Sequence, residues 1–378
     1  MATQQNDPIQ IAGAGPAGLS AAITLARAGR QVIVHEAQAN VGWRFKHDFQ
    51  GLENWTTQRD VLQVLADDGI TTDFDILPGK KGMAYDAWGQ GYPIQSATPF
   101  FYLVVRGPGP GSLDDALLRQ AQALGVEVRF KSRVKKLPFP AILATGPKAA
   151  DAIAVGYHFD TDMEDGFWVI CDNNLAPGGY AYLLVWNGKG TVKTCMFSDF
   201  KQEKKYVENT VAAFERLAGL EMKNPVHHGG VGNFYVPQRA YAGKRPVVGE
   251  QAGFQDTLWG FGMRHAITSG ILAARSFVEE ADYDAMWRAE FNGQLRVSIV
   301  NRALYNMLGN RGYRWFLKRI STKQNIRKSL YGQYHPGFIK TLLYPWANHS
   351  VKRLRSDSDC EHIDCECVWC RSCDCHLV

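Results

Sequence analysis

The chain has 378 residues, of which 46% are hydrophobic and 21% are charged, and its formal net charge is +5. This composition is typical of a soluble globular protein with room for two or three domains, and the charge is too small to indicate a nucleic-acid-binding protein. The chain contains neither a run of eighteen apolar residues, which a transmembrane helix needs, nor the basic-then-apolar start of a signal peptide, so we expect a cytoplasmic location.

The first predicted elements are a strand over residues 8–12, a glycine-rich turn, and a helix over residues 16–28. In a G-x-G-x-x-G turn, the first glycine permits the tight bend and the second lets the backbone approach a pyrophosphate. The third lets the helix pack closely on the strand. The amides and the positive dipole end of the helix then face the phosphates. The residues expected to bind a dinucleotide here are Gly13, Gly15, Pro16, Ala17 and Gly18.

A second strand over residues 31–35 ends at Glu36. This carboxylate stands where an acidic residue takes the ribose hydroxyls of an adenine dinucleotide. Arg44 follows in a loop rich in glycine and aromatic residues. It is either a ligand contact or a solvated surface arginine. A helix over residues 56–69 and short strands over residues 70–105 come next.

The middle of the chain first returns to this nucleotide-binding domain. Ser112 is a plausible N-cap for a helix over residues 113–124, and a buried strand over residues 141–146 ends in a glycine turn. A second domain is predicted from antiparallel strands and one amphipathic helix. The strands span residues 157–171, 179–186 and 191–198, and the helix spans residues 203–218.

The first domain then resumes with a strand at residues 246–250, a glycine- and aromatic-rich loop at 253–262, and a helix at 263–280. A second glycine-rich turn before a second helix is what a long cofactor needs. One helix end holds its pyrophosphate and the other approaches its ring system.

These motifs, in this order, resemble the FAD-dependent oxidoreductases of the glutathione-reductase-like, aromatic-hydroxylase branch. The geranylgeranyl reductases within that branch are the most similar. Their Gly-Asp-Ala-Ala-Gly segment corresponds to residues 249–253, their Gly-x-Gly turn to residues 260–262, and their Ser-Gly pair to residues 269–270. Glu250 replaces their Asp, and their Gly-Tyr-x-Trp-x-Phe-Pro strand is matched only at its start, from Gly179. The Trp-x-Trp-x-Ile-Pro run of flavin halogenases is missing from the sequence.

The resemblance implies an α/β fold with a discontinuous, Rossmann-like FAD-binding domain over residues 1–149 and 241–280. An antiparallel substrate domain is inserted over residues 150–240, with a possible contribution from residues 70–105. The resemblance also implies FAD contacts at Glu36, Arg44, Arg106, Thr145, Gly146, Gly249, Glu250, Gly260 and Gly262. It places Trp259 and Phe261 beside the ring, where they either wall the cavity or are ordinary core aromatics. Tyr180, Tyr182 and Cys195 are weak candidates for a proton donor.

Two C-terminal segments follow, a helical basic region at 281–356 and a Cys-rich tail at 357–378. Residues 291–356 contain thirteen Lys or Arg and no Asp or Glu. This pattern favours peripheral contact with an anionic membrane, a solvated cap on the core or a cradle for the acidic tail, ahead of nucleic acid. The tail cysteines predict a metal site, zinc or iron–sulfur, with redox disulfides as the alternative. They are Cys360, Cys365, Cys367, Cys370, Cys373 and Cys375.

The function expected first is FAD-dependent reduction of carbon–carbon double bonds in an isoprenoid-like or other apolar substrate. A flavin monooxygenase and an electron-transfer flavoprotein coupled to a tail cluster are the alternatives. Residues 138–246 contain no second G-x-G-x-x-G motif, so we expect that another protein donates the electrons.

Overall fold

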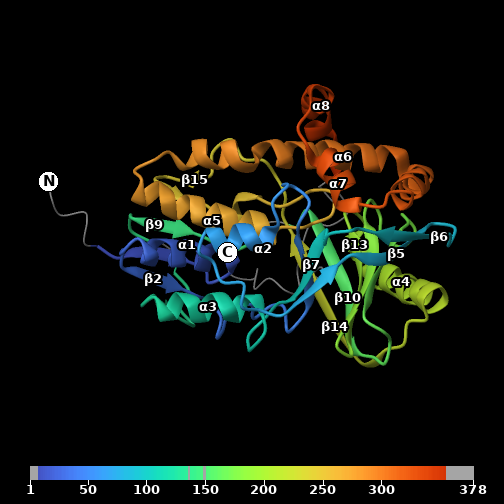
Figure 1. Ribbon diagram of the computed structural model, residues 1–378, viewed down its shortest axis with the longest axis horizontal. Coiled ribbons are helices and arrows are strands. Elements are labelled where there is room, and N and C mark those ends of the chain that lie inside the picture. The colour runs from blue at the N-terminus through green and yellow to red at the C-terminus, as the bar shows by residue number, and fades with distance from the viewer. Residues whose placement is uncertain (1–6, 135–136, 148–149, 355–378) are drawn as a thin grey trace. The chain divides into compact units, whose positions relative to one another are not determined.

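The computed structural model describes residues 7–134, 137–147 and 150–354, and the chain forms two compact units (Figure 1). The chain passes between the units several times, so each one combines early and late parts of the sequence. The first unit contains the residues up to Ile76 together with Tyr102–Lys148 and Phe234–Arg296. The second contains Leu77–Phe101, Ala149–Asn233 and the residues from Val297 onward.

The first unit is built on a parallel four-stranded sheet with the order β8-β2-β1-β9. Its strands are β1 (Ile9–Ala12), β2 (Val32–His35), β8 (Glu127–Arg129) and β9 (Ala141–Leu143). Apolar side chains such as Ile9 and Ile11 in β1 are fully buried, as expected for a parallel sheet that is covered by helices.

Helices α1 (Pro16–Arg27), α3 (Leu113–Ala123) and α5 (Met263–Val278) belong to the same unit. A Cβ atom on Gly270 of α5 would lie 2.1 Å from the Ala17 carbonyl oxygen of α1. The Ser20 hydroxyl of α1 donates to the Ile267 carbonyl at 3.1 Å. The small residues Gly270 and Ala17 therefore let α5 pack closely on α1.

Local signals set the helix ends. The Ser112 hydroxyl accepts a hydrogen bond from the Asp115 amide at 3.1 Å, which confirms the predicted N-cap of α3. Gly29 follows α1 with a φ of +76°. Helix α2 (Val61–Asp67) is shorter than the predicted 56–69, because the Asp60 side chain caps it at 3.0 Å from the Leu62 amide.

The remaining elements of the first unit are short. They are β3 (Phe49–Glu53), most of β7 (Phe101–Val105), β15 (Tyr241–Ala242), β16 (Arg245–Pro246) and the 3-10 helix η2 (Gly249–Ala252). The chain crosses to the second unit within β4 (Ile76–Gly79) and again within the long helix α6 (Tyr283–Ser321).

The second unit contains a seven-stranded sheet with the order β14-β10-β13-β12-β11-β5-β6, in which only β11 and β5 pair in parallel. Its strands are β5 (Lys81–Asp86), β6 (Gly91–Gln95), β10 (Ala152–Asp160), β11 (Gly166–Cys171), β12 (Tyr180–Trp186), β13 (Lys189–Met196) and β14 (Lys223–Gly232). The sheet confirms the predicted antiparallel strands, although the stretch 157–171 is two strands.

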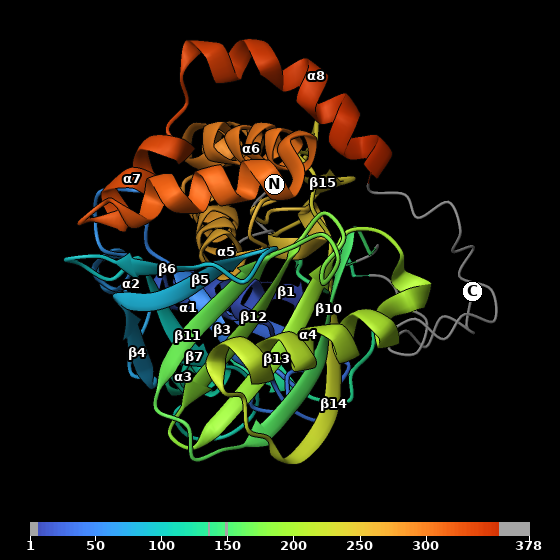
Figure 2. The same ribbon diagram turned by 90° about the vertical axis from the view of Figure 1, so that its right-hand side faces the viewer.

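The 3-10 helix η1 (Phe200–Gln202) leads into α4 (Glu203–Ala218), which lies along one face of this sheet (Figure 2). Helix α4 has the predicted bounds. Its Phe214 is fully buried and packs with the alternate residues Ala181, Leu183 and Val185 of β12. The other residues of β12, including Tyr180 and Tyr182, therefore point to the opposite face of the sheet.

Helix α6 has a break at Gly309, where φ is 55° and ψ is −162°. Helices α7 (Ile326–Tyr334) and α8 (Phe338–Leu354) follow, and the Asn325 side chain caps α7 by accepting from the Lys328 amide at 3.2 Å. Among the residues that the structure describes, none of these helices combines the length and apolar character needed to cross a membrane.

Candidate functional site

In the glycine turn between β1 and α1, two of the three glycines have no space for a side chain, and the third has free space at its Cβ position. A Cβ atom on Gly13, where φ is +105°, would lie 2.2 Å from the Ala144 carbonyl oxygen, and one on Gly18 would lie 1.9 Å from the Gly13 carbonyl oxygen. In contrast, no atom lies within 4 Å of the Cβ position on Gly15. Gly15 is also the N-cap of α1, which has Pro16 in its first turn and no side-chain cap.

This arrangement fits the pyrophosphate of a dinucleotide. The amides of the first turn of a helix have no acceptors within the helix, and here no side chain caps them. The open space at Gly15 gives an anion room to approach these amides. The residues present therefore fit the FAD expected from the sequence.

Glu36 lies beside this turn at the end of β2. Its carboxylate accepts hydrogen bonds from the Ala14 amide at 2.9 Å and from the Gln38 amide at 2.9 Å. The side chain predicted to bind ribose therefore also holds the glycine turn in place.

The other glycine turn of the unit brings together residues from three parts of the chain. The Thr145 amide and hydroxyl both donate to Gln251 Oε1, at 2.7 and 2.8 Å. The Gly249 amide donates to the Ser269 hydroxyl at 2.9 Å. Gly146 has a φ of +86° and open space at its Cβ position. The sequence analysis did not select Gln251, although this residue lies within the Gly249–Gly253 motif.

Arg44 and Glu250 are brought together although 206 positions separate them. The Arg44 Nη2 atom lies 3.1 Å from Glu250 Oε2. The Arg44 side chain is half exposed and that of Glu250 is 18% exposed. Both were predicted to bind the cofactor, and this stays a prediction.

Arg106 is surrounded by protein groups. Its guanidinium donates to both carboxylate oxygens of Asp114 at 2.8 and 2.9 Å and to Gln50 Oε1 at 2.6 Å. It also lies 4.1 Å from the centre of the Phe45 ring. Arg106 and Asp114 are both almost fully buried. The sequence analysis did not select Asp114 as a partner, although this residue is only eight positions away, in the first turn of α3.

The loop before α5 is fixed by a buried carboxylate. Asp256 accepts hydrogen bonds from the Trp259 amide at 2.6 Å and the Leu258 amide at 3.3 Å. The Gln255 side chain donates to the Gly260 carbonyl at 2.6 Å. Helix α5 then starts after Gly262 without a side-chain cap. This second uncapped helix start is at the place predicted to approach the ring system.

Trp259 and Phe261 differ in their surroundings. The Phe261 ring packs on the backbone of β3, since a Cβ atom on Gly51 would lie 2.2 Å from it. The ring also meets Trp55 edge to face, with ring centres 4.7 Å apart. Phe261 is thus held against the β3 backbone and the Trp55 ring. Trp259 is only partly buried.

A buried charged group lies at the start of α5. Glu53 accepts hydrogen bonds from the Thr56 hydroxyl at 2.6 Å and from the Trp55 amide at 3.0 Å, and it lies 3.6 Å from Arg264 Nη1. Burial alone would raise the pKa of Glu53, but the Arg264 charge and these hydrogen bonds outweigh it, and the pKa is lowered. Burial lowers the pKa of His265 to about 4. The group therefore contains an ionised Glu53 and a neutral His265 at neutral pH, and nothing in the sequence pattern singled it out.

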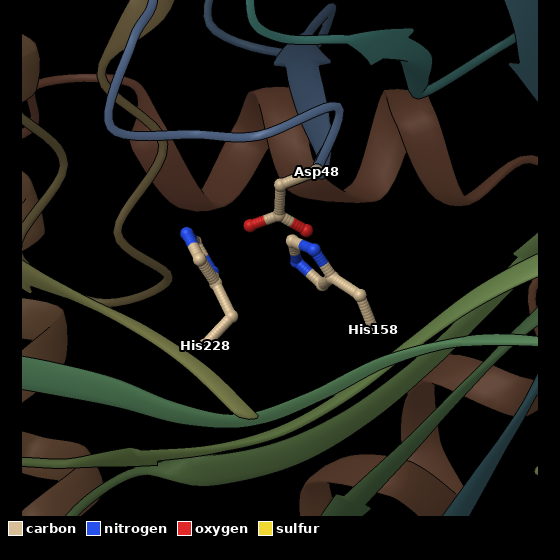
Figure 3. A group of neighbouring side chains, drawn as sticks. All are labelled: Asp48, His158 and His228. Carbon is tan, nitrogen blue, oxygen red and sulfur yellow. The ribbon is translucent and has the colours of Figure 1, made fainter. Parts of the chain in front are cut away.

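The second unit carries a row of polar side chains on the sheet face opposite α4. The register places Tyr182 opposite Lys193, Lys193 opposite Gly156, and Gly156 opposite His228. The buried Lys193 ammonium donates to His228 Nδ1 at 3.0 Å. The rings of His158 and His228 stack with centres 4.3 Å apart (Figure 3). The sequence analysis selected Tyr182 from this row and missed the lysine and both histidines, which become neighbours only through the strand pairing.

Tyr180 and Cys195 face each other in the next row of the same sheet. Burial raises the pKa of the Cys195 thiol to about 11. The six cysteines predicted to bind a metal, Cys360, Cys365, Cys367, Cys370, Cys373 and Cys375, lie outside the described residues.

Known proteins are similar to part or to nearly all of this chain. Residues 11–54 match the family described as an NAD(P)-binding Rossmann-like domain. The digeranylgeranylglycerophospholipid reductase of Haloferax volcanii is 24% identical over 416 aligned positions, which cover 93% of this chain and 89% of that one.

Two solved structures share the fold. A geranylgeranyl bacteriochlorophyll reductase-like protein from Thermoplasma acidophilum has a TM-score of 0.69 at 18% identity, covering 92% of this chain and 98% of that one. A flavin-dependent brominase has a TM-score of 0.64 at 15% identity, covering 91% of this chain and 98% of that one.

The parallel sheet and the glycine turns form a Rossmann-like nucleotide-binding unit, and the relatives of this chain are named reductases. Over most of its length the chain is also similar to digeranylgeranylglycerophospholipid reductases.

Proposed function

We propose that this protein uses FAD to reduce carbon–carbon double bonds in an isoprenoid or similarly apolar substrate. The observation that carries the proposal is the open, uncapped glycine turn at Gly15 in a chain similar along almost its whole length to digeranylgeranylglycerophospholipid reductases. The same turn on its own would serve many dinucleotide enzymes, so the choice of reaction depends on the relatives.

At the nucleotide end of the cofactor, the residues of this chain bind and orient the pyrophosphate and the ribose. The first turn of α1 offers backbone amides to the pyrophosphate, and Gly15 keeps the approach clear. Glu36 is the residue proposed to take the ribose hydroxyls, and its bond from the Ala14 amide at 2.9 Å fixes the carboxylate beside the turn. Thr145, Gly146, Gly249 and Glu250 are proposed to line the middle of the cofactor.

At the ring end, the start of α5 supplies electrostatic stabilisation. Bound flavin supplies the hydride chemistry, and the protein supplies orientation and field. The uncapped amides after Gly262 favour negative charge nearby. The ion pair of Glu53 and Arg264 joins the end of β3 to the first turn of α5 and holds this end of the helix in position.

The substrate is proposed to meet the sheet of the second unit, within the predicted substrate domain of residues 150–240. Tyr180 and Tyr182 lie on the sheet face opposite α4, and their rings are 6.1 Å apart. Either phenol would deliver the proton that accompanies the hydride. Trp259 and Phe261, in the loop before α5, are proposed to lie beside the flavin ring.

One alternative function has a specific observation in its favour. The fold is shared with a flavin-dependent brominase, and one fold can host several different flavin reactions. A flavin monooxygenase is therefore the second candidate. The electron-transfer alternative depends on an iron–sulfur cluster in the tail cysteines and on a protein electron donor, because zinc has no redox chemistry.

The test is one anaerobic preparation of the full chain, examined first by its flavin absorbance and its metal content. The chemically reduced protein is then mixed, without oxygen, with a geranylgeranyl lipid. We expect reoxidation of the flavin and a product heavier by two hydrogens for each double bond reduced. A colourless, folded protein that takes up no added FAD would overturn the proposal. Turnover that requires oxygen would favour the monooxygenase.

We also propose that residues 291–356 make peripheral contact with a membrane. The thirteen basic residues and the absence of acidic ones support this contact, because anionic lipid attracts such a segment. An apolar substrate of the proposed class would be dissolved in that membrane.

A further inference from the structure

Helix α8 exposes an apolar face. Phe338, Leu342 and Trp346 recur at intervals of four residues and are 84%, 70% and 43% exposed. Ile339 beside them is 71% exposed. In an α-helix this spacing puts the side chains on one side. The helix is the outermost one of the C-terminal region in both ribbon views (Figures 1 and 2).

The opposite side of α8 is buried. Ala347 and Val351, also four residues apart, are buried. Lys340, the only charged residue between positions 338 and 351, is partly buried and donates to the Gln333 carbonyl. The charge of this lysine is therefore directed toward α7, and the exposed face carries no charged side chain in that stretch.

The second half of α6 adds exposed apolar side chains together with basic ones. Met307 and Trp315 are 63% and 59% exposed, and Arg311, Lys318 and Arg319 share this exposed stretch of the helix. The Arg319 guanidinium lies 5.5 Å from the centre of the Trp315 ring. Of the thirteen large apolar side chains that are exposed in the described part of the chain, seven lie between residues 307 and 346.

Such a concentration of exposed apolar surface indicates a binding site, and the charge of the surface indicates the kind of partner. Residues 291–356 carry thirteen positive and no negative side chains, so two copies of this surface would repel each other. An anionic lipid surface attracts it and also accepts the apolar face. Tryptophan and tyrosine, present here as Trp315, Tyr344 and Trp346, favour the boundary between lipid and water.

From these observations, we infer that α8 is the element that inserts into the surface of an anionic bilayer. Phe338, Ile339, Leu342 and Trp346 enter the boundary between headgroups and acyl chains, and the basic side chains of α6 and α7 face the headgroups. The inference rests on the proposed function only for the source of the lipid. Its test does not use catalysis, so the two can fail separately.

The experiment is flotation of the full-length protein with lipid vesicles. One set contains phosphatidylglycerol and phosphatidylcholine, and the other contains phosphatidylcholine alone. The test variant is Phe338→Ser/Leu342→Ser/Trp346→Ser. The control variant is Leu124→Ser/Val226→Ser/Val278→Ser, which removes three exposed apolar side chains (40%, 57% and 43% exposed) outside the basic region.

We expect the wild type and the control variant to float with the anionic vesicles, and the test variant to lose about tenfold or more in partitioning. High salt should weaken binding of the wild type. The test variant should keep the circular dichroism spectrum and the Tm of the wild type, because the substituted side chains are exposed.

Three results would overturn the inference. The first is a wild type that does not float with anionic vesicles. The second is a test variant that floats as well as the wild type. The third is a wild type that is dimeric by light scattering without lipid while the test variant is monomeric, which would assign the apolar face to a second copy of the chain.

Discussion

Replacing Arg106 with methionine should destabilise the first unit by about 3–5 kcal/mol, because it breaks a buried ion pair from one side. The Arg106 guanidinium donates to both Asp114 oxygens at 2.8 and 2.9 Å, and the Asp114 side chain is 0% exposed. In the variant this carboxylate keeps the Gly107 amide at 2.9 Å but has no opposite charge. For a unit of this size, the loss corresponds to a fall in Tm of roughly 6–20 °C.

The assay is thermal unfolding of FAD-free protein, followed by circular dichroism or calorimetry. Arg119→Met is the matched control, because Arg119 also pairs with an aspartate of α3, Asp115 at 3.0 Å, but is half exposed. It should cost less than about 1 kcal/mol. Arg106→Met/Asp114→Leu should recover most of the loss, because it removes both charges.

An Arg106→Met variant that melts within about 2 °C of the wild type would refute this reasoning. A recovered double variant that no longer binds FAD would show that Arg106 also contacts the cofactor, as the family resemblance implies. A recovered double variant that binds FAD normally would make Arg106 purely structural.

Three further predictions concern the same fold. Gly15→Ala should weaken FAD binding roughly tenfold or more in a fluorescence titration and leave the Tm of the apoprotein unchanged. Gly18→Ala should lower both the FAD affinity and the Tm of the apoprotein, because its Cβ would lie 1.9 Å from the Gly13 carbonyl oxygen. A normal FAD affinity in Gly15→Ala would contradict the site. Burial lowers the pKa of His265 from 6.5 to about 4. As pH falls, the unfolded chain therefore takes up a proton at His265 before the folded protein does, and the free energy of unfolding should decrease between pH 6.5 and pH 4. This group should make the free energy of unfolding, measured with urea, about 2 kcal/mol lower at pH 5 than at pH 7.5. His265→Gln should lack this part of the pH dependence. Burial raises the pKa of the Cys171 thiol to about 12, so iodoacetamide at pH 8 should label it only in denaturant, as read by peptide mass spectrometry.

The sequence was most informative where structure is set by near neighbours. The turn from Gly13 to Gly18 and the cap at Ser112 lie within a few residues of their partners, and the structure has both where they were expected. The amphipathic period of α4 also predicted both of its ends. Short-range geometry of this kind is fixed by the residues themselves, so it can be predicted from a single sequence.

What could not be predicted depends on pairing across long stretches of chain. The ion pair of Arg44 and Glu250 joins positions 206 residues apart, and no local sequence pattern predicts it. Lys193, His158 and His228 become neighbours only through the register of β10, β13 and β14. The strands at residues 70–105 were expected, but nothing local indicates that β5 pairs in parallel with β11.

The repeated crossing of the chain between its two units has a consequence for synthesis on the ribosome. Strand β1 pairs with β9, and α1 packs on α5, whose last residue is Val278. The nucleotide-binding unit therefore cannot close until more than two thirds of the polypeptide has emerged from the exit tunnel. An early product of translation contains α1 without α5, which packs on it, so a nascent chain exposes the apolar side of α1 during elongation. Expression of residues 1–149 alone should accordingly give an insoluble fragment that chaperones retain.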